Sequence, residues 1–208
     1  MDQATSEQRA AEFYEKVFGG FEEIVGAGAA RWTAEADRWR TFAQRWALNG
    51  YVRRDVNVLV SMVTDDFTNR DPLNFGHVVR GPREFRRMLE DTFLAFPDTV
   101  FVIAEAPFLG LDPDTIVLPW QAMGTFTGPL EWGPPGGRKS FSPNGKRFDF
   151  NGVDMYTLRG AEVCAMRSLY DPIEVAQQLG LAPASASLAL RLAPYPQAIA
   201  AAVQRRMG

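Results

Sequence analysis

The spacing of apolar residues changes about halfway along the chain. In the first half they recur three or four positions apart, which is the spacing of one helix face. This pattern predicts helices over residues 13–24, 32–48, 56–63 and 82–95. From Thr99 onward the runs are rich in β-branched and aromatic residues, which predicts strands over 99–109, 115–126, 146–158 and 162–170. A short helix over 172–180 follows Asp171, and one more is expected in the tail over 197–206.

Helices that precede strands, rather than alternating with them, favour the α+β class. Tight turns such as Arg159-Gly160 predict an antiparallel meander. We expect a curved antiparallel sheet wrapped around helices as a cone open at one end. The predicted organisation is a helical extension over 1–46, the cone domain over 47–181 and a tail over 182–208.

The segment 128–145, between the second and third predicted strands, holds four prolines and five glycines. It is too long for a simple hairpin turn. Its composition fits a binding loop and equally fits a solvated hairpin end.

Composition narrows the partners and the location. Hydrophobic residues make up 46% of the chain and charged residues 23%, as in an ordinary globular protein. The net charge of −3 gives no reason to expect a nucleic-acid partner. No apolar run is long enough to span a membrane, and the polar N-terminus lacks the core of a signal peptide. We therefore expect a cytoplasmic protein.

The chain contains one cysteine, Cys164, and one histidine, His77. These numbers exclude an internal disulfide and metal sites built from several cysteines or histidines. No metal or cofactor is predicted, so acid–base chemistry would fall to carboxylates.

Two stretches, SMVTDDFTNRDPLNFGHVVRGPREFRRML and NGVDMYTLRGAEVCAMRSLYD, resemble the nuclear transport factor 2-like superfamily, and within it the ketosteroid isomerases. The order of AFPD, an apolar strand, GT-x-TG and Pro-Asn-Gly-Lys is similar to that of the SnoaL-like polyketide cyclases. The resemblance covers roughly residues 47–181. It implies a cone with an enclosed pocket and cofactor-free chemistry.

The resemblance also implies roles for three carboxylates. Asp71 falls where the isomerases place their general base, and Asp154 where they place a protonated aspartic acid that binds the oxyanion. Asp149 lies near the acid–base aspartate of the cyclases. Two departures accompany these matches. Trp46-Ala47 stands near the position of the isomerase tyrosine, with Tyr51 displaced, and Phe126 replaces the cyclase histidine.

Asp149 and Asp154 both lie in an apolar predicted strand, where burial of a charge is costly and raises a carboxyl pKa. They are five residues apart, so a regular strand points them to opposite faces. A bulge at Asn151-Gly152 would bring both inward. Each aspartate could instead face solvent or serve a structural hydrogen bond, and Asp71 could be a turn residue before proline.

His77 is a candidate second acid–base group if it faces the mouth of the cone, and otherwise a surface residue. The apolar wall of the pocket has four aromatic candidates: Trp46, Trp120, Phe126 and Tyr156. Trp46 also belongs to a seam with Trp32 and Trp39, spaced seven apart, that fits packing on the domain or on a second subunit.

These features favour an isomerase or cyclase acting on an apolar polycyclic or polyketide-like carbonyl compound. Asp71 or His77 would remove a proton next to the carbonyl, and Asp154 or Asp149 would stabilise the enolate. One alternative is a non-catalytic binding or dimerisation module, since the tryptophan seam and the Ala-rich tail suit a homodimer. The other is an epoxide hydrolase, which needs an arginine between two carboxylates; Arg167 is followed by Ser168 where such enzymes carry an aspartate.

Overall fold

The structure is a computed structural model that describes residues 38, 41–74, 76–103, 108–109, 112, 114–132 and 136–182. The predicted helix over 13–24, Trp32, Trp39 and the predicted tail helix lie outside these residues. The described elements are, in order, η1 (Ala43–Val52), α4 (Val56–Ser61), β1 (Val63–Arg70), η2 (Pro72–Asn74), β2 (Val78–Arg80), α5 (Gly81–Ala95), β3 (Val100–Ile103), β4 (Phe108–Leu109), β5 (Thr115–Thr125), β6 (Leu130–Trp132), β7 (Lys139–Phe141), β8 (Arg147–Arg159), β9 (Glu162–Leu169) and α6 (Pro172–Gln178).

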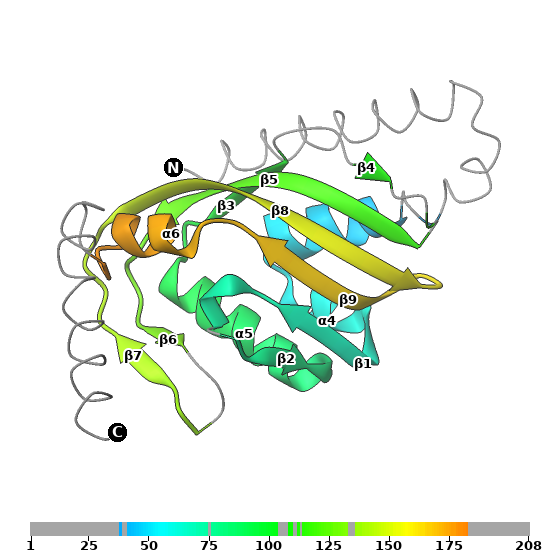
Figure 1. Cartoon of the computed structure of the whole chain (residues 1–208), viewed down its shortest axis with the longest axis horizontal. Coiled ribbons are helices and arrows are strands. Elements are labelled where there is room, and N and C mark those ends of the chain that lie inside the picture. The colour runs from blue at the N-terminus through cyan, green and yellow to red at the C-terminus, as the bar shows by residue number, and fades with distance from the viewer. Residues whose placement is uncertain are drawn as a thin grey trace, which may run out of the picture.

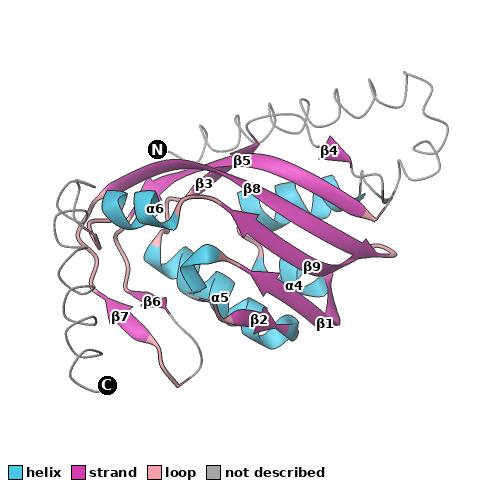
Figure 2. Ribbon diagram, viewed as in Figure 1, coloured by secondary structure: helices cyan, strands magenta, loops and turns pink. Residues whose placement is uncertain are grey.

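The predicted α+β class is confirmed. A seven-stranded sheet runs in the order β2-β1-β9-β8-β5-β3, with β4 also paired to β5, and it arches over α4 and α5 without closing (Figures 1 and 2). The predicted meander holds for β5, β8 and β9, which pair antiparallel in sequence order. It is wrong for β1, which pairs in parallel with β9. The last strand of the chain therefore lies between the first strand and the rest of the sheet.

Local sequence signals set the helix ends. The Asp55 side chain accepts hydrogen bonds from the backbone N–H groups of Asn57 and Val58 and so begins α4. Pro82 occupies the first turn of α5, as predicted. The third predicted helix is shorter than expected, because Val63 already belongs to β1. None of the helices in the described part of the chain is long and apolar enough to cross a membrane.

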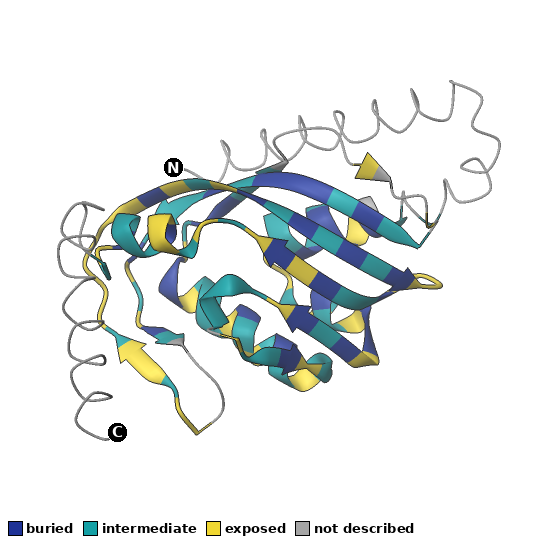
Figure 3. Ribbon diagram, viewed as in Figure 1, coloured by how far each residue is buried: buried dark blue, intermediate teal, exposed yellow. Residues whose placement is uncertain are grey.

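Strand β8 alternates strictly between its two faces over its second half (Figure 3). Asp154 is buried on the concave face, whereas Asp149 is exposed on the convex face. The pairing of β8 with β5 continues without a break from Thr157 to Arg147, so Asn151-Gly152 forms no bulge. The two aspartates therefore point to opposite sides of the sheet.

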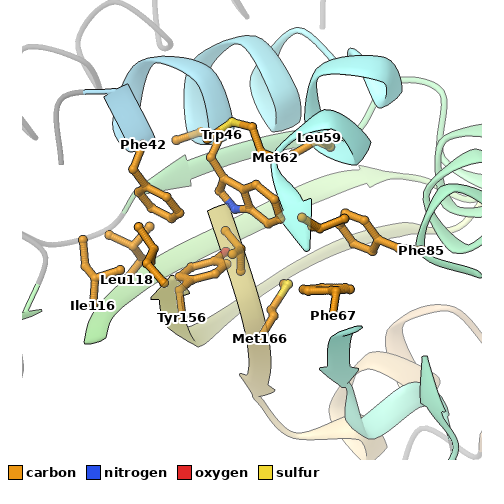
Figure 4. Close-up of a cluster of buried hydrophobic side chains, with 14 of the residues drawn as sticks. Phe42, Trp46, Leu59, Met62, Phe67, Phe85, Ile116, Leu118, Tyr156 and Met166 are labelled. Carbon is orange, nitrogen blue, oxygen red and sulfur yellow. The ribbon is translucent and has the colours of Figure 1, made fainter. Parts of the chain in front are cut away.

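The main core lies between η1, α5 and the sheet (Figure 4). Trp46 is fully buried, and its indole lies between the rings of Phe42 and Phe85 at centroid distances of 5.9 and 5.8 Å. Both Phe42 and Trp46 fall in the predicted N-terminal extension, yet they pack in the centre of the domain. A second core cluster around Phe96, Phe126 and Leu179 fills the other end of the sheet.

The glycine- and proline-rich segment folds in part as the hairpin β6–β7, which extends from the same end of the sheet as α6 (Figure 1). Its base is held by hydrogen bonds from the N–H groups of Thr127 and Gly128 to the Ala95 carbonyl. A Cβ on Gly128 would lie 1.9 Å from the Leu94 carbonyl oxygen, so only glycine allows this approach. Arg138 pairs with Asp91 and so ties the far side of the hairpin to α5.

Candidate active site

A cavity of about 700 Å³ lies between the concave face of the sheet, α5 and the β6–β7 hairpin. Its wall is rich in aromatic rings: Phe96, Phe101, Trp120, Phe148, Phe150 and Tyr170. Trp120 contacts the rings of Phe150 and Tyr170 edge to face, at centroid distances of 5.6 and 5.8 Å. Trp120 can lie flat on β8 because its strand partner is Gly152, where a Cβ would come within 2.3 Å of the indole.

Asp154 lies in the wall of this cavity and is 6% exposed. The Tyr156 hydroxyl donates a hydrogen bond of 2.7 Å to Asp154 Oδ2. Asp154 Oδ1 has no hydrogen-bond partner among the described residues, and neither does the nearby Trp120 Nε1. Burial raises the pKa of Asp154 to about 6, and the charge of Asp71 adds to the rise, while Tyr156, Ser168 and Trp120 oppose it. Asp154 is thus a desolvated acid with one free oxygen.

Asp71 follows the end of β1 and lines the same cavity. Its Oδ1 accepts hydrogen bonds from the Tyr170 hydroxyl and, at 2.8 Å, from the Leu73 N–H. The second bond is that of a turn aspartate before proline, so the structural interpretation of Asp71 holds alongside its position in the cavity. Burial raises the pKa of Asp71, and the hydrogen bonds from Tyr170, Leu73 and Ser168 oppose the rise.

The two carboxylates come from strands that do not touch each other. Strand β9 lies between β1 and β8, and its residue Ser168 is the strand partner of Asp154. Ser168 is buried, and its hydroxyl lowers the pKa of both Asp71 and Asp154. Ser168 is named from the sequence only as the residue at the position of the hydrolase aspartate, because its place between the carboxylates depends on the register of three strands.

Tyr51, which the resemblance gives as displaced from the position of the isomerase tyrosine, borders the cavity. The helix predicted over 32–48 stops before Asn49-Gly50, but η1 continues as a π-helix through Val52 and turns Tyr51 toward the cavity. The only hydrogen-bond contact of its hydroxyl among the described residues is the Met166 sulfur at 3.8 Å. Burial raises the pKa of Tyr51 far above its usual value, and the nearby charges of Asp154 and Asp71 raise it further. A neutral phenol therefore stands close to both carboxylates.

The sequence profile of SnoaL-like polyketide cyclases matches residues 41–179, which is more than half of the chain. The chain belongs to the SnoaL-like polyketide cyclase family. No curated protein matches the sequence.

Solved structures with the same fold include other members or relatives of this family. A candidate SnoaL-like polyketide cyclase from Jannaschia sp. CCS1 is 22% identical, with a TM-score of 0.53 over 73% of this chain and 94% of that one. AclR, a candidate hydroxylase from Streptomyces galilaeus, is 16% identical, with a TM-score of 0.55 over 83% and 98% of the two chains. SalBIII, an epoxide hydrolase/cyclase-like enzyme of pyran ring formation in salinomycin, is 19% identical, with a TM-score of 0.52 over 67% and 95%. Such low identities show the shared fold and leave the reaction open.

Of the other predicted residues of this SnoaL-like protein, His77 and Trp120 also line the cavity. His77 Nε2 lies 3.5 Å from Glu84 Oε2. Asp149 does not reach the cavity: it is exposed, and its Oδ1 accepts a 2.6 Å hydrogen bond from Gln121 Nε2. Its assignment to the site is corrected by its place on the convex face of β8.

Three of the four predicted aromatic wall residues lie behind the cavity instead of in its wall. Trp46 is in the main core, and Phe126 is fully buried in the second cluster. Tyr156 does not border the cavity, but its hydroxyl donates a hydrogen bond to Asp154, which does. Trp46 and Tyr156 belong to the main core cluster and Phe126 to the second cluster, and none of the three borders the cavity.

Two alternative site chemistries find no support in the geometry. Arg167 is exposed on the convex face, so it does not lie between the carboxylates of the cavity as an epoxide hydrolase would require. Within the described ranges, no three His, Cys, Asp or Glu side chains come together in a way that could hold a metal ion.

Proposed function

We propose that this SnoaL-like protein is a cofactor-free acid–base enzyme, an isomerase or cyclase, that acts on an apolar polycyclic or polyketide-like carbonyl compound. The observation that carries the proposal is the meeting of the buried Asp154 and the half-buried Asp71 in an aromatic cavity beside the neutral phenol of Tyr51. The family membership and the fold support a cyclase-type role.

The hydrogen bonds divide the two roles between the carboxylates. Asp71 is the base, because the hydrogen bonds from Tyr170 and Leu73 stabilise its ionised form and reach Oδ1, and neither of them occupies Oδ2. Asp154 is the acid, because Tyr156 donates to Oδ2 and the proton of the neutral form then belongs on the unpartnered Oδ1. Both assignments follow from which oxygen is already occupied.

The reaction then proceeds without a cofactor. Asp71 removes a proton from the carbon next to the carbonyl, and the electron pair moves to the carbonyl oxygen. Asp154 and Tyr51 donate hydrogen bonds to this oxygen and stabilise the enolate. In isomerisation, the enolate of an unsaturated ketone takes the proton back from Asp71 at a different carbon of the conjugated system. In cyclisation, the enolate carbon attacks a second carbonyl, and the alkoxide formed there takes the proton from Asp71. The aromatic wall excludes water, which would quench the enolate.

Proton exchange tests the first step without knowledge of the final product. Polycyclic and polyketide-like ketones are incubated with the protein in D₂O, and deuterium uptake next to the carbonyl is followed by NMR. We expect uptake with the wild-type protein, none above background with Asp71→Asn, and a rate lower by roughly two to three orders of magnitude with Asp154→Asn. Tyr51→Phe removes the second donor and should also slow uptake.

Asp149→Asn is the matched control, since it makes the same change on the same strand but on the convex face. Its exchange rate should equal that of the wild type. Ligand binding without deuterium uptake in any of these proteins would favour the non-catalytic binding module instead. Equal loss in Asp149→Asn and Asp154→Asn would refute the assignment of the concave face.

A further inference from the structure

A second hollow, of about 440 Å³, opens where β1 and β9 end, next to the loop that follows β1. Asp71, Ser168 and His77 border both this hollow and the enclosed cavity. The other residues that line the hollow do not border the aromatic cavity. They include Arg70 and Arg167, which are exposed on the convex face. The hollow thus lies beside the enclosed cavity, at the ends of β1 and β9, and two arginines of the convex face border it.

Arg70 and Arg167 are direct neighbours. They are strand partners in the parallel pair β1–β9, whose backbones lie about 4.8 Å apart. Like charges side by side on a sheet repel and lower stability. Arg80 adds a third cation close by, since it is the strand partner of Thr68, two residues before Arg70. These strands thus bring three cationic residues together near the hollow.

Elsewhere in the same sheet, an arginine is matched with an acid. Arg159 makes two hydrogen bonds, of 3.0 and 3.1 Å, to the carboxylate of Asp66. Arg70 and Arg167 have no such partner among the described residues. Among the residues that the structure describes, Asp71 is the only acid that lines the hollow, and its Oδ1 already accepts hydrogen bonds from Tyr170 and Leu73. His77 is the remaining titratable group there, and it lies beside Glu84.

We propose that Arg70 and Arg167 bind an oxyanion, the carboxylate or phosphate group of a small molecule, in this hollow. A guanidinium presents two parallel N–H donors that match the oxygens of either group. Two guanidinium groups on adjacent strands can donate hydrogen bonds to such a group from two sides. The negative charge of the oxyanion also offsets the repulsion between the two arginines. The hollow adjoins the acid–base cavity, but oxyanion binding by the two arginines does not depend on the reaction proposed above.

Thermal unfolding at constant ionic strength tests the proposal. The wild type, Arg70→Gln, Arg167→Gln and Arg147→Gln are titrated with inorganic phosphate and, separately, with acetate, with sodium chloride making up the ionic strength. Arg147 is the matched control, because it is an exposed arginine on β8 away from the hollow. The anion that gives the larger saturable rise in Tm identifies the chemical class.

We expect the anion to reverse the order of the unfolding temperatures of the wild type and the two arginine variants. Without the anion, Arg70→Gln and Arg167→Gln should unfold at the same temperature as the wild type or higher, because the repulsion is removed. With saturating anion they should unfold lower, and their affinity should be weaker by about tenfold or more, as expected for one lost charged pair. Arg147→Gln should follow the wild type throughout.

The proposal fails if neither anion raises Tm in the wild type, or if all four proteins respond alike. It also fails if Tm depends on protein concentration instead of anion, which would assign the arginines to an acidic surface of a second copy. Should either variant fail to fold, the arginine Nε–H signals of the wild type decide by NMR. Those of Arg70 and Arg167 should shift with the anion, and that of Arg147 should not.

Discussion

Replacement of Asp154 by asparagine should stabilise the protein in a manner that depends on pH. Burial raises the pKa of Asp154 from 3.8 to about 6. Each pKa unit is worth ~1.4 kcal/mol, so ionisation of this group costs the folded state about 3 kcal/mol. Asparagine keeps a side-chain oxygen that can accept the Tyr156 hydrogen bond but carries no charge. The variant should therefore be the more stable protein at high pH.

The sign follows from the order of the two pKa values. Below about pH 4 the carboxyl is protonated in both the folded and the unfolded protein, so Asp154 costs nothing. Between about pH 4 and pH 6 the unfolded chain ionises while the folded protein holds its proton, and the stability contributed by Asp154 is lost as the pH rises. Above this window the cost is constant.

Urea unfolding of wild type and Asp154→Asn at pH 4, 5, 6 and 8 measures the effect. The difference in unfolding free energy should be near zero at pH 4 and reach about 3 kcal/mol in favour of the variant at pH 8. Asp149→Asn, on the exposed face, should show no such pH dependence. A wild type as stable as Asp154→Asn at pH 8, or a difference that does not change with pH, would refute the interpretation of Asp154 as a desolvated acid.

Three further substitutions test residues that hold the side chains and strands of the candidate site in place. Tyr170→Phe removes a hydrogen bond that lowers the pKa of Asp71, so the acidic limb of the pH–rate profile should move to higher pH; an unmoved limb would contradict this role. Gly152→Ala places a Cβ against the Trp120 ring and should cost about 1–3 kcal/mol in urea unfolding, with a changed tryptophan emission spectrum. Gln178→Ala removes two hydrogen bonds to the backbone of β8, of 2.6 and 2.9 Å, and should lower the unfolding free energy by about 1–2 kcal/mol without affecting proton exchange.

The elements that can be predicted from the sequence are those in which buried and exposed residues follow a regular pattern. Helix α5 begins at its glycine and proline and keeps one apolar face, and β5, β8 and β9 are apolar enough to stand out. Strand β1 is not evident from periodicity, because TDDFTNR is mostly polar and is a strand through its pairing with β2 and β9. The homodimer and the cytoplasmic location stay predictions.

The site could be predicted only in part. Strand parity separated Asp149 from Asp154, and the apolar neighbours Phe148 and Phe150 could have shown that Asp149 faces outward. Tyr51 was missed because Gly50 was taken as a helix end. Gly50 is in fact a packing residue, since a Cβ there would lie 2.4 Å from Leu59 Cδ2. Such a contact depends on tertiary structure and leaves no local signal.

The place of β9 in the sheet has a consequence for how the protein is made. Ribosomes release the chain from its N-terminus, so Asp71 and Asp154 both emerge before the strand that belongs between them. Until β9 has entered the sheet, β1 and β8 have exposed edges and the two carboxylates remain in water with ordinary acidity. The arrangement of Asp71 and Asp154 around one cavity therefore requires that β9 has entered the sheet between β1 and β8.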